Sequence, residues 1–200
     1  AFSKNSHTGT ETILLASVLA KGKSIIKGAA EEVEVDELIA FLNYMGAKIW
    51  RSGSKEITIE GVAMLHSAQY TIMPDRNEEV TFAIAAAVTG GSIIVIGSQR
   101  QHLSAFLTAF NAAGGIYEEI DETRTRYGRG TDLRAIELET KPYPGFMTDW
   151  QAPWAVLMTQ ATGASTIHET VFENRFGYAE ELKKMGTQIE PFDPLVADPA

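Results

Sequence analysis

The 200-residue sequence contains no cysteine, only 7 prolines, and no apolar stretch as long as a membrane-spanning helix. The absence of cysteine excludes disulfides, thiolate metal ligands and a thiol nucleophile within this chain. A membrane helix needs roughly 20 predominantly apolar residues, whereas the longest apolar helical stretch runs only from Phe82 to Val88. We therefore predict a protein that does not enter the membrane and that is cytoplasmic.

Positive charge is also scarce, with 17 Lys and Arg against 26 Asp and Glu and a formal net charge of −9. The negative electrostatic field of such a charge repels phosphodiester backbones and anionic lipid, which argues against nucleic-acid and membrane partners. A small anionic metabolite remains compatible, because a few aligned backbone N–H groups can bind one phosphate. The four histidines lack metal-ligand spacing and no Gly-rich nucleotide motif occurs, so we expect no metal and no cofactor.

What the sequence does contain is an internal repeat of about 70 residues. Each copy has an apolar helix, a glycine, a β-branched strand, a second helix and a glycine that leads into another strand. Two independent landmarks give nearly the same spacing. A serine at the start of the first strand recurs after 68 and 73 positions, and the glycine after the second helix recurs after 68 and 72: Ser24, Ser92 and Ser165; Gly46, Gly114 and Gly186.

The two helices of each copy differ in their apolar pattern. The second helix has a stripe at i, i+3, i+4 and i+7, as in Val35, Leu38, Ile39 and Leu42, and is polar on its other side. The first helix is apolar nearly all round, which predicts burial on every side: residues 13–19, 82–88 and 154–158. This difference in apolar pattern between the two helices predicts an α/β (α+β) fold with the helices inside and the sheets outside.

Alternating or β-branched runs predict strands, and glycine-containing segments predict turns. We expect strands at 55–60, 70–73, 93–96 and 135–139, and turns at 51–54 and 127–130. Four arginines lie on or near the second hairpin, where they either grip a phosphate or form the solvated edge of a sheet, and we favour the edge: Arg124, Arg126, Arg129 and Arg134.

Segments before predicted helices are the best places for chemistry, because unpaired N–H groups at a helix start attract anions. Lys4 to Thr10 combines a lysine, three hydroxyl side chains and Gly9, although a plain Ser/Thr helix cap is the alternative. Asp149 precedes an apolar helix containing two tryptophans, a partly dry setting that suits an acid–base group; helix capping is again the alternative. Arg175 can hold a carboxylate or phosphate, or form an ion pair with a nearby acid.

Three motifs, in this order along the repeat, resemble those of the UDP-N-acetylglucosamine 1-carboxyvinyltransferases, a family of enolpyruvyl transferases. They are Met-Pro-Asp-Arg at 73–76, Thr-Asp-Trp-Gln-Ala at 148–152 and Glu-Thr-Val-Phe-Glu-Asn-Arg-Phe at 169–176. The resemblance implies an inside-out α/β barrel built of βαβαββ repeats, with three of six repeats present. Residues 1–72 would be the last repeat of the first domain, and 73–200 two repeats of the second, whose third repeat is missing.

The resemblance also implies a reaction. The family transfers the enolpyruvyl group of phosphoenolpyruvate to the 3-hydroxyl of UDP-N-acetylglucosamine, the first committed step of peptidoglycan synthesis. No metal or other cofactor is implied. Asp149 matches the residue that contacts this hydroxyl, and we expect it to be the base. Further matches imply contacts with the substrates: Lys4, Asn5, Ser6 and His7 with the UDP moiety, Val171 through its backbone, and Arg175.

Two other functions stay open at this point. The shikimate-pathway enolpyruvyl transferase shares the architecture and the phosphoenolpyruvate chemistry, although the 173–176 string Glu-Asn-Arg-Phe argues against it. A noncatalytic relative that binds a UDP-sugar is the second alternative. Because the chain starts with Ala1 rather than Met and lacks several motifs of the family, we expect part of an enzyme that is inactive alone. The oligomeric state stays open.

Overall fold

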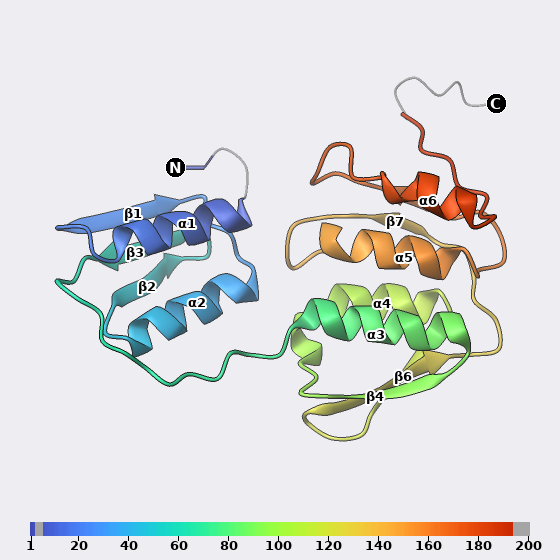
Figure 1. Cartoon of the computed structure of the whole chain (residues 1–200), viewed down its shortest axis with the longest axis horizontal. Helices are drawn as coiled ribbons and strands as arrows, with labels where there is room; N and C mark the ends of the chain where they lie inside the picture. The colour runs from blue at the N-terminus through green and yellow to red at the C-terminus, as the bar shows by residue number, and fades with distance from the viewer. Residues whose placement is uncertain (3–5, 194–200) are drawn as a thin grey trace. The chain divides into compact units, whose positions relative to one another are not determined.

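The computed structural model describes residues 1–2 and 6–193, which divide into two compact units (Figure 1). The first contains the described residues up to Pro74 together with Pro142–Pro144. The second contains Asp75–Lys141 and the described residues from Gly145 onward. None of the helices in these residues has the length and apolar character needed to cross a membrane.

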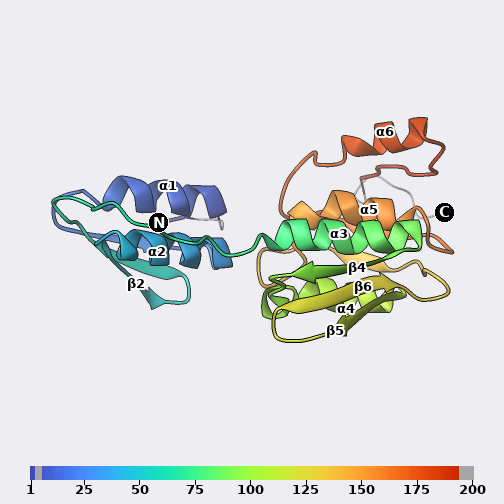
Figure 2. The same cartoon turned by 60° about the horizontal axis from the view of Figure 1, so that its bottom comes forward.

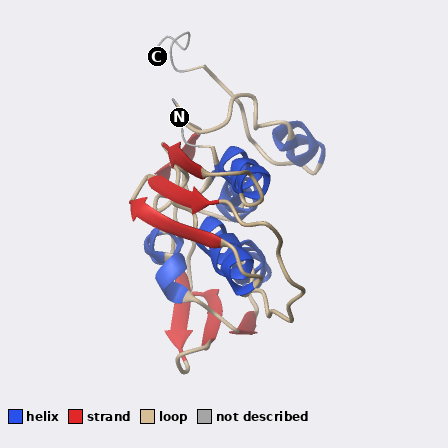
Figure 3. Cartoon of the chain, turned by 90° about the vertical axis from the view of Figure 1, so that its left-hand side faces the viewer, coloured by secondary structure: helices blue, strands red, loops and turns tan. Residues whose placement is uncertain are grey.

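The first unit is a three-stranded antiparallel sheet with two helices on one face (Figure 3). Its strands lie in the order β1-β3-β2, with Ile25 opposite Thr58 and Trp50 opposite the same residue on the other side. The elements follow the chain as α1 (His7–Ser17), β1 (Lys23–Lys27), α2 (Val33–Tyr44), β2 (Lys48–Gly53) and β3 (Glu56–Glu60).

Strand alternation explains which face of this sheet the helices cover. Successive side chains of a strand point to opposite faces, and accordingly Ile26 is 3% exposed while its neighbour Ile25 is 49% exposed. Ile49, Ile57 and Ile59 are also buried, and they join a core with the helices. The core therefore lies between α1, α2 and a single face of the sheet.

The second unit contains a sheet of the same form and a further pair of strands. The antiparallel sheet has the order β4-β6-β5, and β7 pairs with β8 in parallel. Its elements are α3 (Arg76–Thr89), β4 (Ser92–Ile96), η1 (Arg100–His102), α4 (Ser104–Ala112), β5 (Gly115–Glu119), β6 (Arg124–Arg129), β7 (Glu137–Glu139), η2 (Thr148–Trp150), α5 (Gln151–Met158), β8 (Thr166–His168) and α6 (Tyr178–Lys184).

Aromatic side chains fill the core of the second unit. Phe106 of α4 stacks on Phe110 at 5.1 Å and meets the edges of Trp150 and Trp154 at 6.0 and 6.4 Å between ring centroids. Tyr127 contributes from β6 and is fully buried. Helix α3 runs beside β4 and β6, as Figure 2 shows. Three helices and one face of the sheet thus share a single core.

The glycine that follows the second helix of each repeat has one conformational role. Gly46, Gly114 and Gly186 come directly after the helix C-caps and have φ values of 97°, 92° and 93°. Positive φ at this position ends a helix and is natural only for glycine. The repeated glycine is therefore a helix stop. A strand follows the first two glycines, but the expected strand after Gly186 is not formed within the described residues.

Three further expectations about strands and turns are wrong. Residues 51–53 are not a turn but the end of β2, and the turn lies at 54–55. Residues 70–73 form no strand; the Met73 N–H donates instead to the Glu37 side chain at 2.8 Å, and Tyr70 packs on Phe41 at 5.0 Å between ring centroids. Residues 127–129 are not a turn but belong to β6, which is the central strand of its sheet. Arg124 and Arg126 of β6 alternate with the buried Thr125 and Tyr127, so they lie on the outer face of a sheet rather than at its edge.

The expected burial of the first helices on all sides is also wrong for two of the three. In α1 and just beyond it, Ile13, Leu15 and Leu19 are 39%, 54% and 55% exposed, and Phe82 of α3 is 49% exposed. A helix that packs on one sheet face covers only one of its sides. Helix α5 is closest to the expectation, because Trp154, Ala155 and Leu157 are all buried.

Alanine substitutions at two of these glycines distinguish the cost of backbone strain from the cost of a steric clash with the added Cβ atom. Gly114 and Gly186 have nearly equal φ, yet a Cβ on Gly114 would lie 2.3 Å from the Asp132 carbonyl oxygen, whereas one on Gly186 meets nothing within 4 Å. We expect Gly186→Ala to lower the free energy of unfolding by about 1 kcal/mol, and Gly114→Ala by about 1–3 kcal/mol more. Urea denaturation measures both, and equal losses would contradict the prediction.

Candidate functional site

Of the residues expected to bind the UDP moiety, Ser6 and His7 belong to the first unit. Lys4 and Asn5 lie outside the described residues. Ser6 caps helix α1, where its side-chain oxygen accepts the Gly9 N–H at 3.2 Å. His7 is the first residue of that helix, and its Nε2 lies 3.2 Å from Glu11 Oε1. The helix cap considered as an alternative for this segment is thus present, and a role of Ser6 in binding stays a prediction.

Asp149 and Arg175 are brought together in the second unit. The Arg175 guanidinium donates to Asp149 Oδ1 at 2.5 Å and to the Thr148 hydroxyl oxygen at 3.2 Å. It also lies over the Phe172 ring, at 5.5 Å from the centroid. The ion pair weighed as an alternative for Arg175 is therefore formed, and its acid is Asp149. A carboxylate held through one oxygen keeps a second oxygen that can accept a proton from a hydroxyl group.

The surroundings of Asp149 differ from the sequence-based expectation in two respects. It is not a helix cap, because Thr148–Trp150 form a short 3-10 turn whose cap is Met147, and α5 starts only at Gln151. Its side chain is also 43% exposed. The two tryptophans that suggested a dry setting, Trp150 and Trp154, point into the core instead.

Glu169, which follows β8, joins the loop ahead of α6 to the start of α5. Its Oε2 accepts the Thr148 hydroxyl at 2.8 Å and the Gln151 side-chain amide at 2.7 Å. Its Oε1 accepts the backbone N–H groups of Val171 and Phe172 at 2.7 and 2.9 Å. The expected contact residue Val171 is therefore tied, through Glu169, to the segment that carries Asp149.

These hydrogen bonds decide the charge state of Glu169. Burial by itself raises the pKa of this carboxyl group, but hydrogen bonds from the Phe172 N–H, the Thr148 hydroxyl and the Val171 N–H outweigh that effect and lower the pKa. Tyr178 of α6 responds in the opposite direction: burial, and then the negative charge of Glu169, raise its pKa to about 12. Glu169 is accordingly a fixed negative charge at neutral pH.

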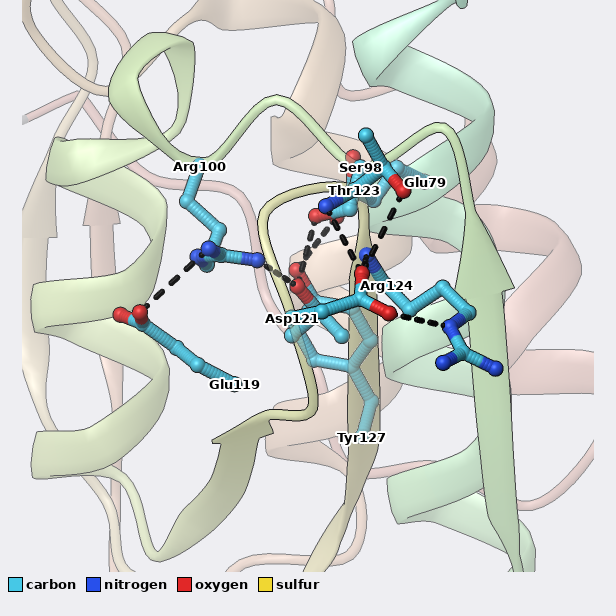
Figure 4. A network of polar contacts seen from close by, with 9 residues as sticks. Glu79, Ser98, Arg100, Glu119, Asp121, Thr123, Arg124 and Tyr127 are labelled. Atoms are coloured by element: carbon cyan, nitrogen blue, oxygen red, sulfur yellow. Dashed lines mark hydrogen bonds and ion pairs between the residues drawn. The ribbon is translucent and has the colours of Figure 1, made fainter.

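A second cluster of polar side chains surrounds Glu79 in the second unit (Figure 4). Glu79 Oε1 accepts the hydroxyls of Tyr127 and Ser98, both at 2.5 Å, and Thr125 lies 2.7 Å from Ser98. Burial, followed by the hydrogen bond to Glu79, raises the pKa of Tyr127. Because these groups are buried and satisfied by one another, we assign the cluster a structural role in joining α3 to β6.

Glu169, Thr148 and Gln151 are not among the site residues predicted from the sequence. A glutamate that directly follows a strand and precedes a loop is a weak signal, because such residues are usually solvated. Within residues 1–2 and 6–193, no three His, Asp or Glu side chains are grouped as metal ligands. The chemistry available at this site is therefore that of a carboxylate, a guanidinium, a hydroxyl and backbone groups.

The sequence matches one known protein family over its whole length. The profile of the EPSP synthase (3-phosphoshikimate 1-carboxyvinyltransferase) family matches residues 1–200. The chain is 48% identical over 183 residues to the UDP-N-acetylglucosamine 1-carboxyvinyltransferase of Magnetococcus marinus, and 45% identical over 181 residues to that of Gluconacetobacter diazotrophicus. These matches cover 91% and 90% of this chain, but only 43% of each relative.

A solved structure extends the comparison to the fold. The crystal structure of the enolpyruvyl transferase NikO from Streptomyces tendae superimposes with a TM-score of 0.77 at 24% identity, over 88% of this chain and 42% of that one. The predicted α/β class is confirmed, and the fold is that of an enolpyruvyl transferase. The chain belongs to the EPSP synthase (3-phosphoshikimate 1-carboxyvinyltransferase) family. Its predicted resemblance to the UDP-N-acetylglucosamine 1-carboxyvinyltransferases is confirmed as well.

The lowered pKa of Glu169 makes stability depend on pH. The ionised form is favoured in the folded state, so its contribution is present above the ordinary glutamate pKa of about 4.3 and is lost as the pH falls through the folded value. We expect Glu169→Gln to be less stable than the unsubstituted chain at pH 7, and this difference to shrink below about pH 4.3. Denaturant unfolding at a series of pH values measures it, and a difference independent of pH would contradict the prediction.

Proposed function

We propose that this chain is part of a UDP-N-acetylglucosamine 1-carboxyvinyltransferase. The enzyme would transfer the enolpyruvyl group of phosphoenolpyruvate to the 3-hydroxyl of UDP-N-acetylglucosamine and release phosphate. The observation that carries this proposal is the identity of 45% and 48%, over about 90% of the chain, to two proteins of that name. Because the chain spans 43% of these relatives, the activity is proposed for a longer protein.

The proposed reaction assigns a role to each site residue. Protonation of the phosphoenolpyruvate methylene carbon and attack of the sugar oxygen on the neighbouring carbon give a tetrahedral adduct. Loss of phosphate and of one proton from the new methyl group then gives the enolpyruvyl ether. Asp149 accepts the proton of the attacking hydroxyl, and Arg175 orients that carboxylate and contributes positive charge near the reacting groups.

We propose that the UDP moiety is bound by residues at and ahead of position 7 and by one backbone group near position 171. In this proposal the binding residues are Lys4, Asn5, Ser6, His7 and Val171. A hydroxyl and N–H groups near a helix start are suited to phosphate oxygens, and the capping position of Ser6 is compatible with such a contact.

We also infer the inside-out barrel, with three of its six βαβαββ repeats in this chain. Residues 1–72 would close the first domain and 73–200 would supply two repeats of the second. The shared strand orders β1-β3-β2 and β4-β6-β5 support the repeat. The exposed side chains of Ile13, Leu15 and Leu19 support the inference that further repeats lie outside this chain. In a longer protein, those repeats would cover this apolar surface.

The substrates suggest where such an enzyme acts. Phosphoenolpyruvate and nucleotide sugars are cytoplasmic metabolites, so we propose a cytoplasmic enzyme of cell-wall biogenesis, with consequences for cell shape and division. A second candidate comes from the family description itself, which names a 3-phosphoshikimate 1-carboxyvinyltransferase. The two candidates share the enolpyruvyl donor and differ in the acceptor.

A test of the base uses a hybrid enzyme, in which this chain replaces the matching stretch of the Magnetococcus marinus relative. We expect Asp149→Asn to lower kcat by about 10²–10⁴-fold, because the amide cannot accept the hydroxyl proton. Phosphate release measures the rate, and the exposed Asp132→Asn is the matched control. An unchanged kcat would show that Asp149 is not the base and that its role is limited to the ion pair with Arg175. The 200-residue chain alone should release no phosphate.

A second test separates the two acceptors. Isothermal titration of the hybrid enzyme with UDP-N-acetylglucosamine and with 3-phosphoshikimate compares their affinities directly. We expect binding of the nucleotide sugar at least about tenfold tighter, a preference of about 1.4 kcal/mol. Tighter binding of 3-phosphoshikimate would reject the proposed function in favour of the second candidate.

A further inference from the structure

Glu169 has no role in the proposed reaction, yet its carboxylate is the acceptor of an extensive set of hydrogen bonds. It receives four hydrogen bonds, two at each oxygen, with lengths of 2.7 to 2.9 Å. Two of the donors, Val171 and Phe172, lie two and three residues further along the chain. The other two, Thr148 and Gln151, lie 21 and 18 residues earlier. Glu169 thus connects two segments that are distant in sequence.

Each of these segments carries one residue of the proposed site. Asp149 follows Thr148 directly, and Val171 is itself a donor to Glu169. The Thr148 hydroxyl donates to Glu169 and at the same time accepts from Arg175, which in turn donates to Asp149. A continuous series of hydrogen bonds therefore runs from Glu169 through Thr148 and Arg175 to the carboxylate of Asp149.

We propose that Glu169 is a positioning residue that fixes the Asp149 segment and the Val171 backbone relative to each other, so that both address one bound acceptor molecule. This inference rests on the proposed function. Glu169 does not touch the reacting atoms in this proposal. It acts through Thr148 on the orientation of Asp149, and through its own loop on the Val171 backbone.

The charge and the side-chain length of Glu169 fit this positioning role. An ionised carboxylate is acceptor-only and offers about four lone-pair positions, which match its four donors. The buried Gln151 has its side-chain N–H₂ directed at Glu169, while its other side-chain atom, Oε1, has no hydrogen-bond partner. A glutamine at position 169 can therefore be accommodated by a flip of Gln151. An aspartate is one methylene shorter and cannot reach both segments at once.

This difference in reach gives a sharp experiment in the hybrid enzyme. We expect Glu169→Asp to lower kcat by about 10²-fold, the effect of a misplacement of about 1 Å, and to raise KM for UDP-N-acetylglucosamine while KM for phosphoenolpyruvate stays the same. Glu169→Gln, which keeps the length but loses the charge, should retain at least about ten times more activity than Glu169→Asp. The exposed Glu137→Gln on β7 is the control and should match the unsubstituted enzyme.

Each alternative outcome has a definite meaning. Higher activity of Glu169→Asp than of Glu169→Gln would overturn the proposal, because charge rather than reach would then matter. A fall in kcat that follows the folded fraction in circular dichroism, with both KM values unchanged, would also overturn it and leave a structural role. An unsubstituted hybrid that folds but transfers no enolpyruvyl group would instead count against the proposed function.

A second measurement tests the geometry without any activity. In the 200-residue chain, the Val171 and Phe172 amide protons are hydrogen-bonded to Glu169, so their exchange with solvent should be slow. We expect Glu169→Asp to speed the exchange of these two amides by about tenfold or more, while the exchange of core amides in α3 stays the same. Equal exchange in both chains would overturn the positioning role even if the hybrid is inactive.

Discussion

Burial of helices against only one face of a three-stranded antiparallel sheet is the constraint on which both units depend. In each unit, the strand between the other two, β3 or β6, pairs with both neighbours, and the alternating isoleucines or aromatics of the inner face build the core. Apolar burial of this kind is the main favourable term in folding. The outer faces carry charged pairs, such as Arg126 with Glu118 at 2.6 Å.

Within this framework, two glutamates are held by hydrogen bonds but differ in what they connect. Glu79 is buried and joins α3 to β6 and to the turn after β4, so it supports the core itself. Glu169 is only partly buried and joins the loop ahead of α6 to η2 and to the start of α5. A fully satisfied polar network fixes one arrangement, because each displaced donor would lose its acceptor. The fold therefore provides a rigid support beneath an accessible carboxylate and guanidinium.

The pairing of Asp149 with Arg175 links this support to the proposed chemistry. The side chains are 43% and 35% exposed, so the ion pair adds little to stability. Its value is geometric, because the planar guanidinium holds Thr148 and Asp149 in a fixed relation. The proposed enolpyruvyl transfer needs an oriented base and positive charge close to a phosphate, and the structure places a carboxylate and a guanidinium side by side.

Local sequence patterns determined much of this protein: the order of helices and strands, the glycine stops at 46, 114 and 186, the strands at 56–60 and 92–96, and the family resemblance. They work because periodicity and capping depend on residues a few positions apart. Only the tertiary structure decided that 70–73 forms no strand, that α1 keeps one side exposed, and that Glu169 meets Thr148. Those outcomes depend on which partners the chain path brings within hydrogen-bonding distance across 21 to 36 residues, and no local pattern encodes that path.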